Sequence, residues 1–466
     1  MQNKNTKFIL QLLFVALYVI VCVSAENLVI DDAYITFQYA KNLAEFGKPW
    51  YNLDPTFQGN GQTSILWMVL LSIIHFFGLK IEIFFLWLNI GFGSFLIIKL
   101  IDFLKFDVDK WVTNIFNFSL ISFFVIWLFM NSIHGLETIF ACLILFLFLG
   151  NWDKTNNYFT LFLPLVRPEF ILFQVFWVLD TKFFSADFFR KISIAFLGVL
   201  IYGLYYFVFF DYYILLPFLY KSEFKVYTLH QLIVYCGLLL VFLPVFISLF
   251  AKKKFLLLIP LNILFFYYTF NVQSYSSGIF SRYYFPLMAI YFVVPVGSLH
   301  FQFFNKFAQV SLKILLIISV LRMIDLSNNF FQQKKNIAFE NIGYYNSYKN
   351  LISYLKPSDK VTINDAGFTA YFSTATCYDG VGLNDATIML SRKTKDFNAY
   401  RNYIKEKKIN YVSVGSLMQN KFTARSPAEN FIFRSLNLRA QKPFMVFPMD
   451  KGFYLFVYHF ENGYNF

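Results

Sequence analysis

The sequence predicts an α-helical polytopic membrane protein that carries a small soluble α/β domain at its C-terminal end. Of its 466 residues, 58% are hydrophobic and only 14% are charged. Apolar runs recur over residues 1–324, several of them near the length of about 20 residues that a helix needs to cross a bilayer. From residue 325 onward, loops and shorter mixed helix and strand patterns replace these runs. We therefore expect a transmembrane domain at 1–324 and an extracytoplasmic α/β domain at 325–466.

The first apolar run covers residues 8–24 and follows Lys4 and Lys7. It ends in Val23-Ser24-Ala25, which resembles a signal-peptidase site, so the chain from Glu26 onward is expected outside, whether the segment is cleaved or retained. Further membrane segments are predicted at 82–100, 113–130, 133–150, 191–210, 228–250, 255–271, 283–300 and 308–324.

Two further apolar segments are unusual. Residues 63–79 are short and follow the polar turn at 59–62, which predicts an interfacial or re-entrant helix. Residues 157–180 are interrupted by Arg167-Pro168-Glu169, which predicts two short limbs that meet at this triplet. The resulting arrangement has about eleven crossings. We favour it because it places more Lys and Arg in the cytoplasmic loops than outside.

The soluble region and the overall charge narrow the class further. Short buried strands are predicted at 361–363 and 411–414, with a basic helix at 396–408 between them. The net charge of +13 is spread over short loops, so membrane orientation and anionic lipids explain it, and no nucleic-acid partner is expected. The four cysteines are widely spaced and show neither a disulfide framework nor zinc-ligand spacing.

The polar residues of the membrane region gather on the outer face in this topology. Carboxylates near a bilayer are costly unless they are paired or used. A lipid-phosphate leaving group needs cations or a metal to hold its charge, and an attacking hydroxyl needs a carboxylate base. The sequence thus predicts a site for a lipid-linked phosphate substrate, built from Asp31, Asp32, Glu137, Arg167, Glu169, Lys221 and Arg282.

Each of these residues also has a structural interpretation. Asp32 suits the N-cap of a helix expected at 33–46 and ended by Gly47, which would leave Asp31 as the freer base. The other residues also have possible structural roles. Glu137 suits an anion in a first helical turn. Arg167 and Glu169 can form an ion pair across the broken helix, and Arg282 and Lys221 can anchor helix ends.

Several motifs resemble one known group. Asp31-Asp32-Ala33-Tyr34-Ile35-Thr36 resembles the first-loop signature that carries the catalytic aspartate of polytopic GT-C glycosyltransferases, which take sugars from polyprenyl-phosphate donors. The nearest likeness is to the branch of the mycobacterial terminal arabinofuranosyltransferases. Further likenesses lie in Gly61-Gln62-Thr63-Ser64-Ile65-Leu66-Trp67, His134-Gly135-Leu136-Glu137-Thr138, Arg167-Pro168-Glu169, Leu216-Pro217 with Lys221, and Arg282 with Pro286.

The likeness covers most of the membrane region, with departures. Gln62, Ile65 and His134 differ from the motifs, and the loop before Lys221 lacks the Asn-Thr pair of the group. In the soluble domain, Asp365-Ala366-Gly367 and the run 379–385 look like recurring turns of the same branch.

The resemblance implies a GT-C-like fold whose juxtamembrane helices form a donor cavity, and an inverting transferase in which Asp31 or Asp32 is the base. It implies donor and phosphate contacts from Arg282, Lys221, Arg167, Glu137, Glu169, Thr63 and Ser64, and acceptor contacts from Asp365, Asp379 and Asp385. A divalent cation, Mg²⁺ or Mn²⁺, is a candidate cofactor.

The expected partners are a polyprenyl-phosphate sugar, with a pentofuranose such as arabinofuranose as one candidate, and a cell-surface glycan or glycolipid acceptor. The expected place is the cytoplasmic (inner) membrane of a bacterium, with the site facing the periplasm or exterior. Two alternatives remain at this stage. One is a transporter or flippase of lipid-linked glycans, which would use the same charges to bind a head group. The other is a catalytically silent assembly scaffold.

Overall fold

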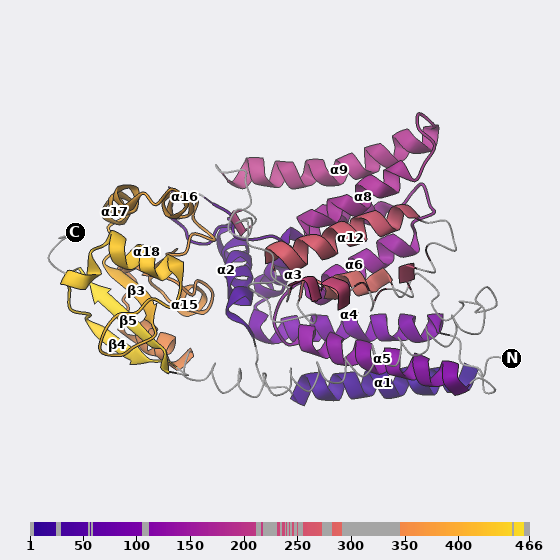
Figure 1. Cartoon of the computed structure of the whole chain (residues 1–466), viewed down its shortest axis with the longest axis horizontal. Coiled ribbons are helices and arrows are strands. Elements are labelled where there is room, and N and C mark those ends of the chain that lie inside the picture. Colours follow the sequence, from indigo (N-terminus) through magenta and orange to yellow (C-terminus); the bar gives the residue numbers. More distant parts are fainter. Residues whose placement is uncertain are drawn as a thin grey trace.

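The chain is mostly helical and carries a small sheet domain at its C-terminal end (Figure 1). The computed structural model describes residues 4–24, 29–54, 56, 59–104, 111–210, 216–217, parts of 231–249, 255–272, 282–290, 345–449 and 452–460. Among these residues, three helices are long and apolar enough to cross a membrane, namely α1 (Lys4–Ser24), α4 (Ile81–Phe103) and α9 (Ala186–Phe209). The chain therefore has the character of a membrane protein.

Most of the predicted membrane segments that the structure describes are helical. Segments 8–24 and 82–100 lie within α1 and α4, 191–210 coincides with α9 to its last residue at 209, and 113–130 lies within α5 (Trp111–Ser132). The segment predicted at 133–150 becomes helical only at α6 (Thr138–Gly150), because a turn at Gly135, with φ of 82°, precedes it. The segment at 308–324 and most of 228–250 and 283–300 lie outside the described residues, so the eleven crossings stay a prediction.

Two helices follow the first apolar segment at the end of the bundle that faces the sheet domain (Figure 1). Helix α2 (Asp31–Phe46) ends as predicted at Gly47, whose φ of 67° only glycine adopts without strain. Helix α3 (Ile65–Phe76) packs on α2. Its 12 residues are too few for the roughly 20 that a crossing needs, which supports an interfacial position.

The segment at 157–180 is broken where the sequence predicts. It consists of η1 (Tyr158–Phe162), α7 (Leu163–Val166), η2 (Pro168–Phe170) and α8 (Ile171–Leu179). Arg167 stands between the limbs with extended dihedrals, φ −148° and ψ 119°. An extended residue before proline is the conformation that the proline ring favours. Beyond it along the chain lie η3 (Phe255–Leu257), α12 (Leu258–Tyr267), the π-helical turn η4 (Tyr268–Val272) and η6 (Phe285–Met288).

The C-terminal domain is built on a five-stranded mixed sheet with strand order β2-β1-β3-β5-β4. Strands β1 (Lys360–Ile363), β2 (Thr376–Asp379) and β3 (Tyr411–Ser416) are parallel, whereas β5 (Tyr454–His459) pairs antiparallel with β3 and with β4 (Met445–Pro448). The helices between strands are α15 (Phe368–Phe372), α16 (Ala386–Thr394), α17 (Phe397–Glu406) and α18 (Pro427–Ser435), followed by η9 (Leu438–Ala440). The two predicted strands and the predicted helix are thus confirmed, while the boundary at 324–325 lies outside the described residues.

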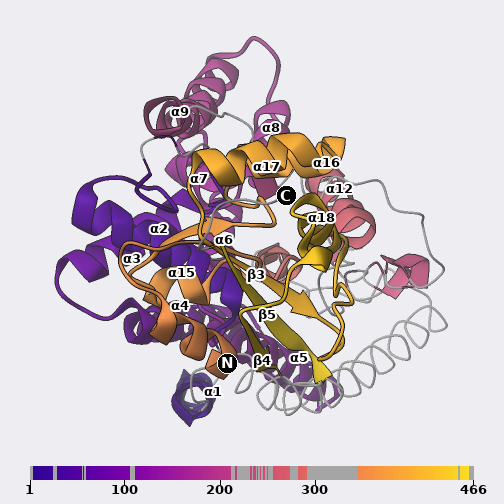
Figure 2. The same ribbon diagram turned by 90° about the vertical axis from the view of Figure 1, so that its left-hand side faces the viewer.

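The sheet domain packs directly onto the helical part, and in the view along the long axis it lies in front of the helices (Figure 2). Helix α15 contacts α2, and one apolar core contains buried side chains from α2, α3, α4 and the sheet. Polar contacts cross the same boundary: Tyr39 Oη donates to Asn384 Oδ1 at 3.2 Å, and Asn52 donates to the carbonyl of Cys377 at 3.1 Å. This packing brings the first loop of the membrane region against the strand ends of the sheet.

Candidate functional site

The strand order of the sheet domain marks one edge as a place for ligands. Strand β1 has β2 on one side and β3 on the other, both parallel to it, so the chain reverses its direction of winding next to β1. In open α/β sheets, ligands bind outside the carboxyl ends of the strands at such a switch point. The residues that follow β1 and β3 at this edge include Asn364, Asp365 and Arg425.

A cavity of about 620 Å³ lies between this edge and the helical region. Its size is within the range of small-molecule sites. Eight of the site residues predicted from sequence line this cavity, although they come from segments far apart in the chain. They are Asp31, Asp32, Thr63, Glu137, Arg167, Glu169, Arg282 and Asp365. The candidate site therefore belongs to both parts of the molecule.

Asp31 is the first residue of α2 and is held by the sheet domain. Its Oδ2 accepts the backbone N–H of Gly367 at 3.0 Å and its Oδ1 accepts that of Phe368 at 2.8 Å. Burial raises the pKa of Asp31 to about 7, and the nearby carboxylates of Asp365 and Asp32 act in the same direction against the two backbone hydrogen bonds. A carboxylate with a pKa close to neutrality is matched to general-base work.

Gly367 makes this contact possible. A Cβ atom on residue 367 would overlap the backbone carbonyl of Asp31. The Asp365-Ala366-Gly367 turn can therefore approach α2 closely only because its last residue has no side chain.

Asp32 points to a cation from a distant segment. Its Oδ2 lies 2.6 Å from Nη2 of Arg282, and 47% of its side chain is exposed. The N-cap of α2 is Ile30 and no side chain caps the helix, so the capping role considered for Asp32 is wrong. Arg282 also donates to the hydroxyl of Tyr283 at 3.0 Å.

Arg167 lies at the centre of a second ionic cluster. Its Nη2 is 2.7 Å from Glu137 and its Nη1 is 3.7 Å from Glu169. The ion pair predicted across the broken helix is thus present, and Nη2 also donates to the backbone carbonyl of Arg282 at 3.2 Å. Glu137 is the N-cap residue of α6 and not part of its first turn, and its side chain makes no capping hydrogen bond.

Arg167 is 3% exposed, and its Nε and Nη1 have no hydrogen-bond partner among the described residues. Buried donors without partners are costly in a folded protein. Since Arg167 lines the cavity, its guanidinium places positive charge beside an anionic ligand group bound there.

Of the other predicted site residues, three are described by the structure and do not line the cavity. Ser64, which follows Thr63 of the lining in the chain, is buried. Asp379 accepts backbone N–H groups of 381, 382 and 384, which holds the turn after β2. Asp385 caps α16 through the N–H of Ile388 and also accepts the hydroxyl of Tyr403. Lys221 lies outside the described residues.

The cavity also has residues that the sequence did not single out. Arg425 pairs with Asp365 at 3.0 Å and with Glu429 at 3.1 Å, and Tyr348 donates to Asp365 at 2.7 Å. Burial raises the pKa of Glu429, which is 1% exposed at the start of α18. No motif marks Arg425, and the only sequence signal was that a polar loop follows the strand predicted at 411–414.

Among the described residues, no three Asp, Glu, His or Cys side chains gather closely enough to hold a metal ion. The carboxylates of the cavity are engaged with arginines or backbone N–H groups instead. The divalent cation expected from the resemblance therefore stays a prediction.

In a comparison with known families, residues 333–447 match a domain of unknown function (DUF8728). This region includes β1, β2, β3 and the residues Asp365 and Arg425 of the cavity. No match was found among curated proteins.

Proposed function

We propose that the protein is a membrane glycosyltransferase of the GT-C type that moves a sugar from a polyprenyl-phosphate donor to a glycan or glycolipid acceptor. The observation that carries the proposal is the convergence of Asp31, Asp32, Glu137, Arg167 and Arg282 on one cavity. These residues belong to four separate motifs, and a cavity that joins a carboxylate base to arginine cations meets the needs of a lipid-phosphate leaving group.

Asp31 is the base in this mechanism. Each of its carboxylate oxygens accepts one backbone N–H and keeps a further lone pair for a hydroxyl of the acceptor. Asp31 takes the proton from this hydroxyl as the oxygen attacks the anomeric carbon. The bond from that carbon to the phosphate oxygen breaks, and polyprenyl phosphate leaves with the bonding electrons. A single displacement of this kind inverts the configuration and forms no covalent sugar-enzyme intermediate.

Arg282 and Arg167 hold the phosphate that leaves. Arg282 is partly exposed to the cavity beside Asp32, and the buried guanidinium of Arg167 adds a second positive charge to the wall. Cations placed in advance where charge develops lower the barrier in the transition state. Lys221 and Thr63 are further candidates on this donor side.

The acceptor side is the wall that the sheet domain contributes. This wall presents hydrogen-bond acceptors from the carboxylates of Asp365 and Glu429 and donors from the guanidinium of Arg425. Side chains that both donate and accept are suited to sugar hydroxyls. The roles of Asp379 and Asp385 in this picture are indirect, since their carboxylates hold the loops that shape the wall.

The finer topology belongs to the same proposal. It includes about eleven crossings, a sheet domain outside the membrane, and a location in the inner membrane of a bacterium with the cavity on the outer side. The finding in support is that α1, α4 and α9 are suited to cross a membrane while α2 and α3 lie beside the sheet domain.

The direct test is sugar transfer by the purified full chain. The protein is given a panel of radiolabelled polyprenyl-phosphate sugars and surface-glycan acceptors, with Mg²⁺, with Mn²⁺ and with a chelator. Transfer of label from one donor supports the proposal. Movement of an intact lipid-linked glycan across reconstituted vesicles, with no transfer from any donor, would instead identify a flippase.

A further inference from the structure

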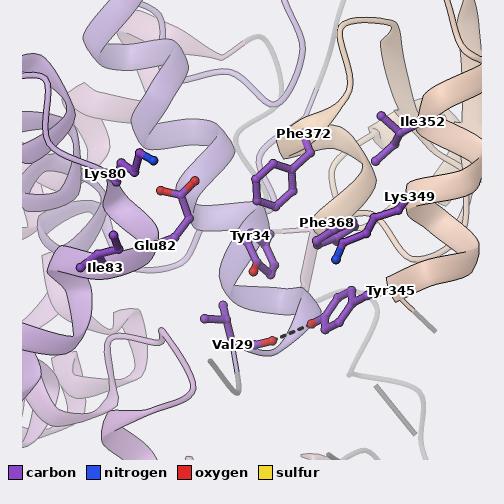
Figure 3. A pocket seen from close by; sticks show the side chains of 10 residues that line it. All are labelled: Val29, Tyr34, Lys80, Glu82, Ile83, Tyr345, Lys349, Ile352, Phe368 and Phe372. Carbon is purple, nitrogen blue, oxygen red and sulfur yellow. Dashed lines mark hydrogen bonds between the residues drawn. The ribbon is translucent and has the colours of Figure 1, made fainter. Parts of the chain in front are cut away.

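A second cavity, of about 520 Å³, lies between the start of α4 and the sheet domain. It shares no lining residue with the candidate catalytic cavity. Figure 3 shows its two sides, one from α2 and α4 and one from α15 and the helical residues 345–354. The lining consists of Val29, Tyr34, Lys80, Glu82, Ile83, Tyr345, Lys349, Ile352, Phe368 and Phe372.

The charges of this cavity favour an anion. Lys80 and Lys349 are exposed and approach from its two sides (Figure 3). Neither has an ion-pair partner within 4 Å in the part of the chain that the structure describes. Burial raises the pKa of Tyr371, and the acidic residue of the lining, Glu82, acts in the same direction because its carboxylate accepts the hydroxyl of this tyrosine. The lining therefore has two positive side chains and one negative one, and the negative one already accepts a hydrogen bond.

The aromatic wall of the cavity favours hydrocarbon over a sugar ring. Tyr34 packs edge to face on Phe368, with ring centroids 5.4 Å apart, and Phe368 packs on Tyr345 at 4.6 Å and on Phe372 at 4.7 Å. Because these rings already cover one another, they form an apolar surface rather than a free face for stacking on a sugar. Aliphatic side chains of Val29, Ile83 and Ile352 complete this surface.

The position of the cavity indicates where its ligand comes from. Lys80 directly precedes the first residue of α4, a helix suited to cross a membrane. Phe76, Phe77 and Ile83, close by in the chain, expose large apolar side chains. Lysines and aromatic side chains at the end of a membrane helix mark the level of the lipid headgroups.

We propose that this cavity binds an anionic phospholipid, whose phosphate lies at Lys80 and Lys349 and whose hydrocarbon lies on the aromatic wall. Since α4 supplies one side and the sheet domain the other, the bound lipid stabilises the packing of the two parts. The proposal does not depend on the catalytic function.

The test uses the full chain purified in detergent and titrated with phosphatidylglycerol or with phosphatidylcholine of the same acyl chains. Bound copies are counted by native mass spectrometry. We expect phosphatidylglycerol to bind more tightly and to raise the thermal unfolding midpoint. The double variant Lys80→Gln/Lys349→Gln should weaken its binding about 25-fold, because each lysine near an anionic lipid contributes about a fivefold factor.

The matched control is Lys356→Gln/Lys393→Gln, which removes two exposed lysines outside the cavity and should leave binding unchanged. Glu82→Gln keeps a partner for Tyr371 but removes the negative charge, so it should tighten binding. The single variants Lys80→Gln and Lys349→Gln provide the comparison if the double variant unfolds. Equal binding of the two lipids, unchanged binding in the lysine variants, or displacement by polyprenyl phosphate at lower concentration than phosphatidylglycerol would overturn the proposal.

Discussion

The Oδ1 atom of Asp31 lies 2.8 Å from the backbone nitrogen of Phe368, which follows it by 337 residues in the chain. The sheet domain thus fixes the orientation of a carboxylate in the first loop of the membrane region, and its packing contributes to the burial that raises the pKa of this group. It follows that the candidate site is complete only when the sheet domain is docked on α2.

The close approach at Gly367 gives a first prediction. Gly367→Ala places a methyl group where the carbonyl of Asp31 lies, so the sheet domain must shift. We expect a lower thermal unfolding midpoint and a loss of transfer activity. Gly203→Ala in α9, where a Cβ atom meets open space, is the control and should change neither. Wild-type stability and activity in Gly367→Ala would contradict the packing described.

The pKa of Asp31 predicts the pH dependence of transfer. The base must be ionised, and the ionised form of Asp31 predominates only above its pKa of about 7. The rate should therefore fall about tenfold for each pH unit below 7 and level off above it. The measurement is kcat/KM between pH 5 and 9. A profile that stays flat down to pH 5 would exclude Asp31 as the base.

Arg282 should act on the donor. Arg282→Gln removes a cation beside Asp32, and loss of one donor to a developing anion costs about 100-fold in rate. Arg282→Lys keeps the charge and should recover part of the activity. The exposed Arg190 provides the control variant, Arg190→Gln. Full activity in Arg282→Gln would show that the phosphate is held elsewhere.

Arg425 should act on the acceptor. Because removal of Arg425 alone would leave Glu429 buried without its partner, the test uses the double variant Arg425→Gln/Glu429→Gln. We expect the acceptor KM to rise about tenfold or more, since about two hydrogen bonds to sugar hydroxyls are weakened, while the donor KM stays the same. Arg439→Gln/Glu406→Gln, on the exposed surface, is the matched control. A change in the donor KM alone would place this wall on the donor side.

The sequence predicted the helical wall of the cavity better than the wall that the sheet domain contributes. Charged residues inside apolar segments are conspicuous, and Arg167-Pro168-Glu169 both breaks its helix and lines the cavity as expected. Arg425 and Glu429 lie in an ordinary polar loop and an ordinary helix start, where charges are common. They become notable only when the order of β1, β2 and β3 brings them to Asp365.

Local capping was the least predictable feature. Asp32 and Glu137 each stand near a helix start, and an N-terminal carboxylate most often serves the helix. In the structure both carboxylates turn to arginines from distant segments instead. Asp379 and Asp385, in contrast, appeared as site candidates and hold the backbone of their own loops. The difference lies in tertiary packing, which short-range patterns do not contain.

The most direct test of the central claim compares Asp31→Asn with Asp32→Asn in the sugar-transfer assay. The amide keeps the size of the side chain but cannot take a proton at neutral pH. We predict that Asp31→Asn lowers transfer by about 100-fold to 10,000-fold, as expected for loss of a general base, while donor binding and thermal stability change little. Asp32→Asn should retain more activity, because it leaves the base in place while it changes the partner of Arg282 and a charge near Asp31. Transfer by Asp31→Asn at the wild-type rate, from a folded protein that binds donor, would contradict the account.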